Sequence, residues 1–287
     1  MILEQTAENH PPLSTHNKMQ KPTLVGEGLH VLNVQIDAAI RKQDRSFLIN
    51  RVGREIATGA EALAINLGPG RIMAELTPWV VETIAGAVDV PLFLSAGITA
   101  LDSVLEKYGP RITINAVTAH PDTLTEHLAT AKRYGTHLVV LLVRPGMVPT
   151  GIDDRLQLAS EVIGTAMDIG LPPKQLYLDP VITCRPDPQA WRISRGMPDI
   201  HPVLETIVTI NELQMDIKTI VAMGNGTLGL SRQQKSAAQC RMLKLLTEAG
   251  AGAVILNCLD KSLMATANHL MQDTLSAVND GFHHMLQ

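Results

Sequence analysis

The feature that most constrains this chain is an alternation of two kinds of segment, which begins at Thr23 and continues for most of its length. Short apolar runs bounded by polar residues or glycine alternate with longer segments whose apolar residues recur at helical spacing. This order is typical of repeated βα units, in which helices join parallel strands. The predicted strands are Leu24 to Glu27, Ala62 to Asn66, Pro91 to Ser95, Arg111 to Asn115, Leu138 to Val143, Leu176 to Asp179, Thr219 to Met223 and Ala253 to Asn257.

The intervening segments have the pattern of amphipathic helices, and several of them end in glycine, as helices often do. Examples are TPWVVETIAGAV, DTLTEHLATAKRYG and DDRLQLASEVIGTAMDIG. Eight βα units in about 255 residues match the size of a (β/α)8 TIM barrel. We predict a single-domain barrel over residues 23–287, preceded by a flexible N-terminal arm at 1–22. A doubly wound open sheet is the alternative, but no glycine-rich phosphate-binding fingerprint follows the first strand.

Composition agrees with a barrel core and narrows the class of partner. Of the 287 residues 45% are hydrophobic but only 3% are aromatic, so the core must consist mainly of aliphatic side chains. The net charge of -4 and the scattered Lys and Arg residues give no basic stripe of the kind that binds nucleic acid. The longest strand-like apolar run, Leu138 to Val143, is far shorter than the ~18 residues of a spanning helix. We therefore expect neither nucleic acid nor a membrane as partner.

The cysteines and histidines predict neither a disulfide framework nor a metal site. Cys184, Cys240 and Cys258 lie far apart and form no CxxC pair, which favours a reducing cytoplasm. The segment MILEQTAENH is acidic where a signal peptide is basic. HPPLSTH near the start and the terminal His-His pair lack a carboxylate or Cys at ligand spacing, so we expect no metal. His30 and His120 follow strands closely enough to contact a ligand, although a lone loop His is more often a solvated residue.

The residues that end the predicted strands carry the functional signal, because active sites of (β/α)8 barrels form at the C-terminal ends of the strands. Four of the eight are Asn, and an amide offers both a donor and an acceptor. A ring of such groups suits a flat, neutral heterocycle, with the Asp179 carboxylate accepting from a paired ring N–H and amino group. The alternative is that each Asn only satisfies loop backbone. The eight are Glu27, Asn66, Ser95, Asn115, Arg144, Asp179, Asn225 and Asn257.

The longest connection, VITCRPDPQAWRISRGMPD at 181–199, follows the sixth strand. Loops of this length are often functional, and this one leaves the face on which barrel active sites form. We interpret it as a lid that meets a partner or the tail of a ligand. A surface excursion that merely covers the barrel is the alternative. The residues assigned to this loop are Arg185, Trp191, Arg192 and Arg195.

Six short motifs occur in order at barrel spacing, and together they resemble the pterin-binding methyltransferase family. The family is typified by methyltetrahydrofolate:corrinoid/iron-sulfur protein methyltransferase, with dihydropteroate synthase as a more distant relative. The resemblance covers nearly all of the chain after Thr23. It implies a (β/α)8 barrel, often dimeric, that moves a methyl group between N5 of a reduced pterin and the cobalt of a corrinoid on a separate protein. The motifs are VGEG, ALAINLGPG, ITINAV, PTGIDDR, LYLDPVI and MGNGTLGL.

The resemblance also implies roles for particular residues. Asn115 and Asp179 match positions that hydrogen-bond the pyrimidine edge of the pterin, and Asn225, beside Gly224, matches the Asn that reaches toward N5. We therefore assign catalysis to Asn225. A neutral amide can donate a hydrogen bond that strengthens as N5 gains electron density. The residues assigned to pterin binding are Glu27, Asn66, Ser95, Asn115, Asp179, Gly224 and Asn225.

The chain departs from the family pattern at two strand ends and after the first strand. Ser95 and Ala64 stand where the family has Asp, and Gly28 to His30 replace an Arg-Ile-Asn run. Losing one charge-assisted hydrogen bond costs about 1.5 to 3 kcal/mol of binding. A non-catalytic pterin-binding subunit is therefore an alternative. A dihydropteroate synthase is disfavoured, because its Ser-x-Lys and Arg-x-His patterns are missing from MGNGTLGL and AVILNCLD.

Overall fold

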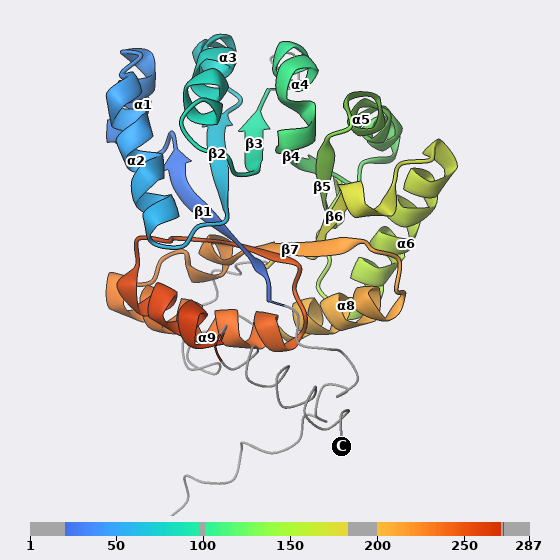
Figure 1. The fold of residues 1–287 in the computed structure, drawn as a ribbon. Coiled ribbons are helices and arrows are strands. Elements are labelled where there is room, and N and C mark those ends of the chain that lie inside the picture. Colours follow the sequence, from blue (N-terminus) through green and yellow to red (C-terminus); the bar gives the residue numbers. More distant parts are fainter. Residues whose placement is uncertain (1–20, 98–100, 183–199, 271, 273–287) are drawn as a thin grey trace, which may run out of the picture.

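The computed structural model describes residues 21–97, 101–182, 200–270 and 272. Eight parallel strands form a closed barrel in sequence order, and the last strand pairs with the first. The fold is a (β/α)8 TIM barrel, as the alternation of segments predicts (Figure 1). The strands are β1 (Thr23–His30), β2 (Ala62–Gly68), β3 (Leu92–Ala96), β4 (Ile112–Thr118), β5 (His137–Leu141), β6 (Leu176–Asp179), β7 (Lys218–Ala222) and β8 (Ala253–Leu256).

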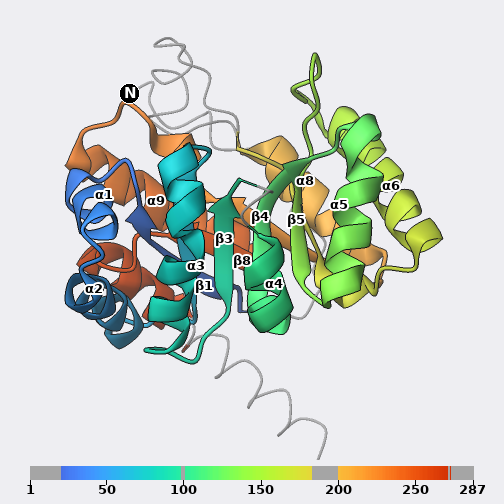
Figure 2. The same ribbon diagram turned by 90° about the horizontal axis from the view of Figure 1, so that it is seen from above.

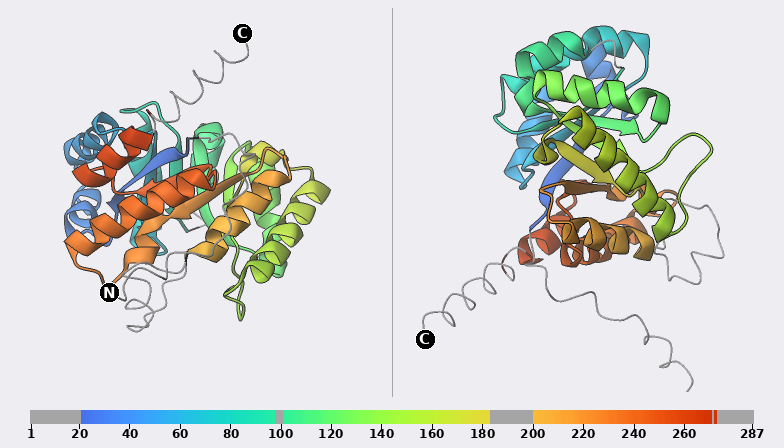
Figure 3. Two further views of the ribbon diagram at one scale, coloured as in Figure 1. Left: turned by 90° about the horizontal axis from the view of Figure 1, so that it is seen from below. Right: turned by 90° about the vertical axis from the view of Figure 1, so that its right-hand side faces the viewer.

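Helices surround the strands as an outer layer and follow one another in chain order around the barrel in Figure 1. Figures 2 and 3 show the same layer from other sides. The α-helices are α1 (Val34–Arg41), α2 (Arg45–Ala57), α3 (Arg71–Ala85), α4 (Asp102–Tyr108), α5 (Pro121–Tyr134), α6 (Ile152–Ile169), α8 (His201–Glu212) and α9 (Arg232–Glu248). The connections within the described ranges contain three short 3-10 helices: η2 (Gly109–Arg111), η3 (Pro173–Gln175) and η4 (Met223–Thr227). A further helical stretch covers 261–270. None of the helices that the structure describes is long and apolar enough to cross a membrane.

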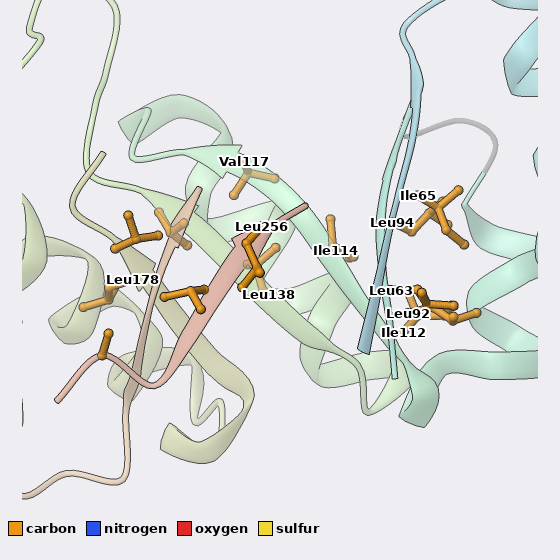
Figure 4. Packing of buried hydrophobic residues seen from close by; sticks show 14 of the residues in the cluster. Leu63, Ile65, Leu92, Leu94, Ile112, Ile114, Val117, Leu138, Leu178 and Leu256 are labelled. Carbon is orange, nitrogen blue, oxygen red and sulfur yellow. The ribbon is translucent and has the colours of Figure 1, made fainter. Parts of the chain in front are cut away.

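The core has two layers, because successive strand residues point to opposite sides of the sheet. The larger cluster lies between strands and helices, where side chains of neighbouring strands such as Leu63 and Leu92 pack in register (Figure 4). The smaller cluster fills the barrel interior, and its two rings, Phe93 and Tyr177, meet edge to face with centroids 5.7 Å apart. Its other buried members are Val25, Ala62, Ala64, Val139, Ile220, Ala253 and Ile255.

Local sequence explains where the helices begin and end. The Asp44 side chain accepts from the Phe47 N–H at the start of α2, and Ser231 and Gln234 form a reciprocal capping box at the start of α9. Helices α5 and α6 end at Gly135 and Gly170, which have φ values of 64° and 73°. Glycine adopts this left-handed conformation without steric cost, so the glycine ends expected from the sequence are confirmed at these two helices.

All eight predicted strands are present, with ends displaced by a few residues. The largest differences are at β1 and β4, which continue three residues beyond their predicted ends, to His30 and Thr118. The register of β1 against β2 is irregular between Gly26 and Leu29. At the other extreme, β5 ends two residues before the predicted Val143. The N-terminal arm lies almost entirely outside the described residues, and so does most of the 181–199 loop.

Candidate functional site

The C-terminal ends of the strands place most of the predicted polar residues at one mouth of the barrel. Alternate residues of a strand share a side, and Val25, Phe93 and Tyr177 all belong to the interior cluster. Residues two positions further along therefore continue the same inner side. By this relation Glu27, Ser95 and Asp179 face the barrel axis, and Asn66 and Asn257 stand in the same relation to Ala64 and Ile255.

Asp179 is the most deeply buried of the predicted site residues, with 5% of its surface exposed. Burial raises the pKa of its carboxyl to about 7, against the opposing effects of the Val181 N–H and Arg155. One carboxyl oxygen, Oδ1, accepts a hydrogen bond of 2.8 Å from the Val181 N–H. Within the described ranges no hydrogen bond reaches the other oxygen, Oδ2. Asp179 thus retains an acceptor for a donor that enters the barrel mouth.

Arg155 of α6 binds the backbone of the turn after β6, and sequence reasoning did not select this residue. Its buried guanidinium donates from Nε to the Pro180 carbonyl at 2.8 Å and from Nη2 to the Val181 carbonyl at 3.4 Å. Val181 has a φ of 53°, which is an outlier for a β-branched residue and is held only when neighbouring contacts fix it. The available signal was the motif PTGIDDR, in which Arg155 is the last residue.

Ser95 and Asn115 meet at the ends of β3 and β4, where the Ser95 hydroxyl donates a hydrogen bond to the Asn115 carbonyl. Both line a cavity of about 330 Å³ between the ends of β2, β3 and β4, which we call the β2–β4 pocket. Asn66 pairs in register with Ser95, but its Oδ1 accepts from the Gly68 N–H at 3.1 Å and so satisfies its own loop. The pocket is also lined by Gly68, Pro69, Leu94, Ala96, Gly97, Leu101, Ile114, Ala116 and Val117.

Gly224 and Asn225 lie in η4, directly after β7, and the Asn225 side chain is exposed. Glu27 reaches this segment from β1, because a Cβ built on Gly224 would lie 3.2 Å from Glu27 Oε2. Strand β8 lies between β1 and β7 in the barrel, so Glu27 extends across the end of β8. The structure therefore brings Glu27, Gly224 and Asn225 together on one side of the mouth. Asp179 lies on β6, next to β7.

A second buried carboxyl group lies behind β1, and sequence reasoning missed it. Glu55 of α2 is 1% exposed, and its Oε2 accepts a hydrogen bond of 3.1 Å from the Gly28 N–H. A Cβ on Gly28 would lie 1.3 Å from Glu55 Oε1, and one on Gly26 would lie 2.3 Å from Oε2. The glycines of the VGEG motif thus make room for this carboxyl group. The signal available in the sequence was a Glu within the buried stripe of an amphipathic helix.

The remaining polar residues named from the sequence mainly serve their own loops. Asn257 Oδ1 accepts from the Leu259 N–H, His30 Nδ1 from the Leu32 N–H, and His120 Nδ1 caps α5. Arg144 forms an ion pair of 2.8 Å with Glu161 of α6. Asn66 and Asn257 thus each bind loop backbone through Oδ1, and the assignment of Asn66 to the ligand stays a prediction. Arg185, Trp191, Arg192 and Arg195 lie outside the described residues.

No hydrogen bond joins Asn115 to Asp179 among the described residues, although both strands end at the same mouth. Strand β5 separates them, so a single ligand would have to span that strand to bind both. Ala64, at one position where the resembled family has Asp, packs in the interior cluster with Phe93. In the same part of the chain, no group of three or more His, Cys, Asp or Glu residues is placed to hold a metal ion.

No protein-family model matches this chain. Among solved structures, dihydropteroate synthase from Yersinia pestis with a pterine-sulfa conjugate superposes with a TM-score of 0.62 at 14% identity, over 90% of this chain and 95% of that chain. Dihydropteroate synthase from Xanthomonas albilineans, in complex with 7,8-dihydropteroate, gives a TM-score of 0.61 at 14% identity, over 90% and 94%. The enzyme from Vibrio fischeri ES114 gives 0.60 at 12% identity, over the same shares. At these identities the likeness establishes the shared barrel fold.

Proposed function

We propose that this protein is a cytoplasmic enzyme that binds a reduced pterin of the tetrahydrofolate or tetrahydromethanopterin type at the mouth of the barrel. The observation that carries the proposal is Asp179, a buried carboxyl group whose Oδ2 accepts no hydrogen bond from the residues that the structure describes. An adjacent ring N–H and amino group would supply the charge-assisted hydrogen bonds that such a group lacks. The solved structures of similar fold include dihydropteroate synthases bound to a pterine-sulfa conjugate and to 7,8-dihydropteroate, which supports this ligand class.

The reaction that we propose is methyl transfer between N5 of the pterin and the cobalt of a corrinoid held by a partner protein. When bound, the corrinoid supplies the nucleophile or the methyl donor. This chain orients the pterin through Asp179, Asn115 and the backbone near Gly224, while the exposed Asn225 amide donates a hydrogen bond to N5. That bond strengthens as the nitrogen gains electron density, which stabilises the transition state more than the bound substrate. We also propose that the protein forms a homodimer.

The 181–199 loop is the segment that we propose for contact with the corrinoid protein or the pterin tail. Arg and Trp are enriched at interface hot spots, and the loop follows Asp179 directly. Replacing Arg192 and Arg195 together with Ala should raise the apparent KM for the corrinoid protein and leave the rate with free methylcobalamin unchanged. Equal slowing with both acceptors would assign the loop to the pterin site instead.

Dihydropteroate synthesis is the second candidate, because the solved structures described above have that activity in their names. The sequence favours methyl transfer, since no Lys or Arg occurs in η4 or in the residues that end β8. A non-catalytic pterin-binding subunit is the third candidate.

One set of assays separates these candidates. Methyl exchange between methylcobalamin and tetrahydrofolate or tetrahydromethanopterin should occur with this protein and be absent without it. Formation of dihydropteroate without methyl exchange would establish the second candidate. Calorimetric binding of the pterin with neither reaction would establish the third, and absence of binding would overturn all of them.

A further inference from the structure

Glu27 and Glu55 form an acidic pair on opposite sides of β1. The methyl-transfer scheme above uses neither residue. Glu27 faces the barrel mouth, with its Oε2 3.2 Å from the position of a Cβ on Gly224. No hydrogen bond to its carboxyl group is present among the described residues. Glu55 lies on the opposite side of the same strand, beneath Gly26 and Gly28. Two carboxyl groups therefore share one strand end, and one of them lies beside the residue that precedes Asn225.

The electrostatic surroundings of Glu27 come from three elements. Burial raises the pKa of the Glu27 carboxyl, Lys235 of α9 lowers that pKa, and the negative charge of Glu55 raises it. The thiol of Cys258, after β8, has a pKa raised to about 12 and so adds no charge at neutral pH. Proximity of two carboxylates is a general way to make one of them retain its proton to higher pH.

Glu55 is itself restrained by contacts that fix its place. Its Oε1 lies 3.4 Å from Arg51 Nε, and no hydrogen-bond donor satisfies that oxygen in the described structure. Burial raises the pKa of Glu55, while the Gly28 N–H, Arg51 and Arg54 lower it. The space under β1 admits no Cβ at Gly26 or Gly28, so the carboxyl group is held against the strand that carries Glu27.

We propose that Glu27 donates the proton that N5 acquires during methyl transfer, and that Glu55 is a positioning residue that sets the pH range over which Glu27 can do so. This inference rests on the proposed function. The N5–methyl bond breaks and its electron pair remains on N5, while the methyl group would bond to the corrinoid cobalt through an electron pair that the reduced, Co(I) form of the acceptor supplies. N5 then has two electron pairs: one accepts from the Asn225 amide and the other takes the Glu27 proton. The Glu27 carboxylate regains its proton from water.

The first test measures the Glu27 titration directly, without substrate, by carbon NMR of carboxyl-labelled glutamate, with Glu27→Gln used to identify the signal. Glu55→Gln should lower the midpoint, because a neighbouring negative charge is removed. Lys235→Met should raise it. Glu82→Gln, on the exposed face of α3, is the matched control and should leave it unchanged. Shifts of the same sign for Glu55→Gln and Lys235→Met would overturn the electrostatic role, because a general loosening of the site would move both alike.

The second test measures methyl exchange against pH. Glu27→Gln should reduce turnover by about 100-fold or more, as loss of a general acid does, and weaken pterin binding by a much smaller factor. The alkaline decline of turnover should move in the same directions as the NMR midpoints in the Glu55 and Lys235 variants. Undiminished turnover of Glu27→Gln with an active wild-type enzyme would overturn this inference alone. Absence of exchange by the wild-type enzyme would instead overturn the proposed function.

Discussion

At the residue scale, Asp179 combines a structural contact and a proposed binding role on separate atoms. Its Oδ1 holds the Val181 N–H, so Asp179→Asn preserves that contact while removing the charge and placing an amide donor toward the ligand. We expect the substitution to weaken pterin binding at least tenfold, about 1.4 kcal/mol, by titration calorimetry. Unchanged affinity would contradict the placement of the pterin against Asp179.

The same residue predicts how folding stability responds to pH. Its folded pKa of about 7 lies above the ordinary value of 3.8, so the folded state binds the proton more tightly than the unfolded state. Stability from this group is fully present below the ordinary value and declines as pH rises through about 7. Asp179→Asn should flatten that decline, measured as the melting temperature between pH 5 and pH 8. A steeper decline in the variant would show that ionised Asp179 stabilises the fold.

Pterin affinity should show the opposite trend with pH. The donors of the ligand bind the ionised carboxylate better, so binding should release a proton and strengthen as pH rises through about 7. Calorimetry in buffers of different ionisation enthalpy measures this proton directly. Proton uptake on binding would mean that Asp179 meets the ligand in its neutral form.

Asn225 is expected to act in the transition state more than in the complex. Asn225→Ala should lower turnover by about a hundredfold, as loss of a transition-state donor does, with a much smaller change in pterin affinity. Steady-state kinetics combined with calorimetry separates the two effects. Equal losses in turnover and affinity would reassign Asn225 to ground-state binding.

At the scale of elements, the contact between β1 and α2 depends on the space that Gly28 leaves for the Glu55 carboxyl group. Gly28→Ala places a Cβ where Glu55 Oε1 lies, so we expect a loss of about 2 kcal/mol in the free energy of unfolding. Glu55→Ala leaves the Gly28 N–H unpaired and should also destabilise. The double variant should lose less unfolding free energy than the two single losses added together, by at least about 1 kcal/mol in denaturant titrations. Strict additivity would contradict the steric match.

The elements also show what sequence reasoning can and cannot recover. The strands were predictable because each is a short apolar run between turn residues, and β6 was located to the residue. The Asn66 and Asn257 amides were assigned or considered for the ligand because they end predicted strands, whereas their hydrogen bonds to Gly68 and Leu259 depend on loop geometry. Glu55 and Arg155 were missed for the converse reason: their partners are backbone groups of distant strands and turns.

At the scale of the whole molecule, helical residues near the end of the described chain complete the cover of the barrel. Leu263 and Met264 are buried in the outer cluster, and Leu263 is 0% exposed. Leu263→Ala should therefore cost about 2 to 5 kcal/mol of unfolding free energy, measured in denaturant. Ser262→Ala, at an exposed position of the same helix, is the matched control. A small loss at Leu263 would mean that this helix packs loosely on the barrel.

The closed barrel itself was predictable from the number and spacing of the βα units, but the composition of its mouth was not. Closure makes β1 and β8 neighbours, so Glu27 can extend over the end of β8 to Gly224, which lies far from it along the chain. Local patterns contain no information about that approach. The fold does not identify the reaction either, since the same architecture supports different chemistries through its loops.

The steric match between Gly28 and Glu55 has a consequence for how sequences of this kind diverge. A side chain at position 28 and an acidic residue at position 55 cannot occupy the same space, so substitutions at the two positions should be inherited together. Homologues with any residue other than glycine at position 28 should have lost the acidic residue at position 55. Where both are retained, the pair marks lineages in which the hidden charge behind the first strand has been kept under selection.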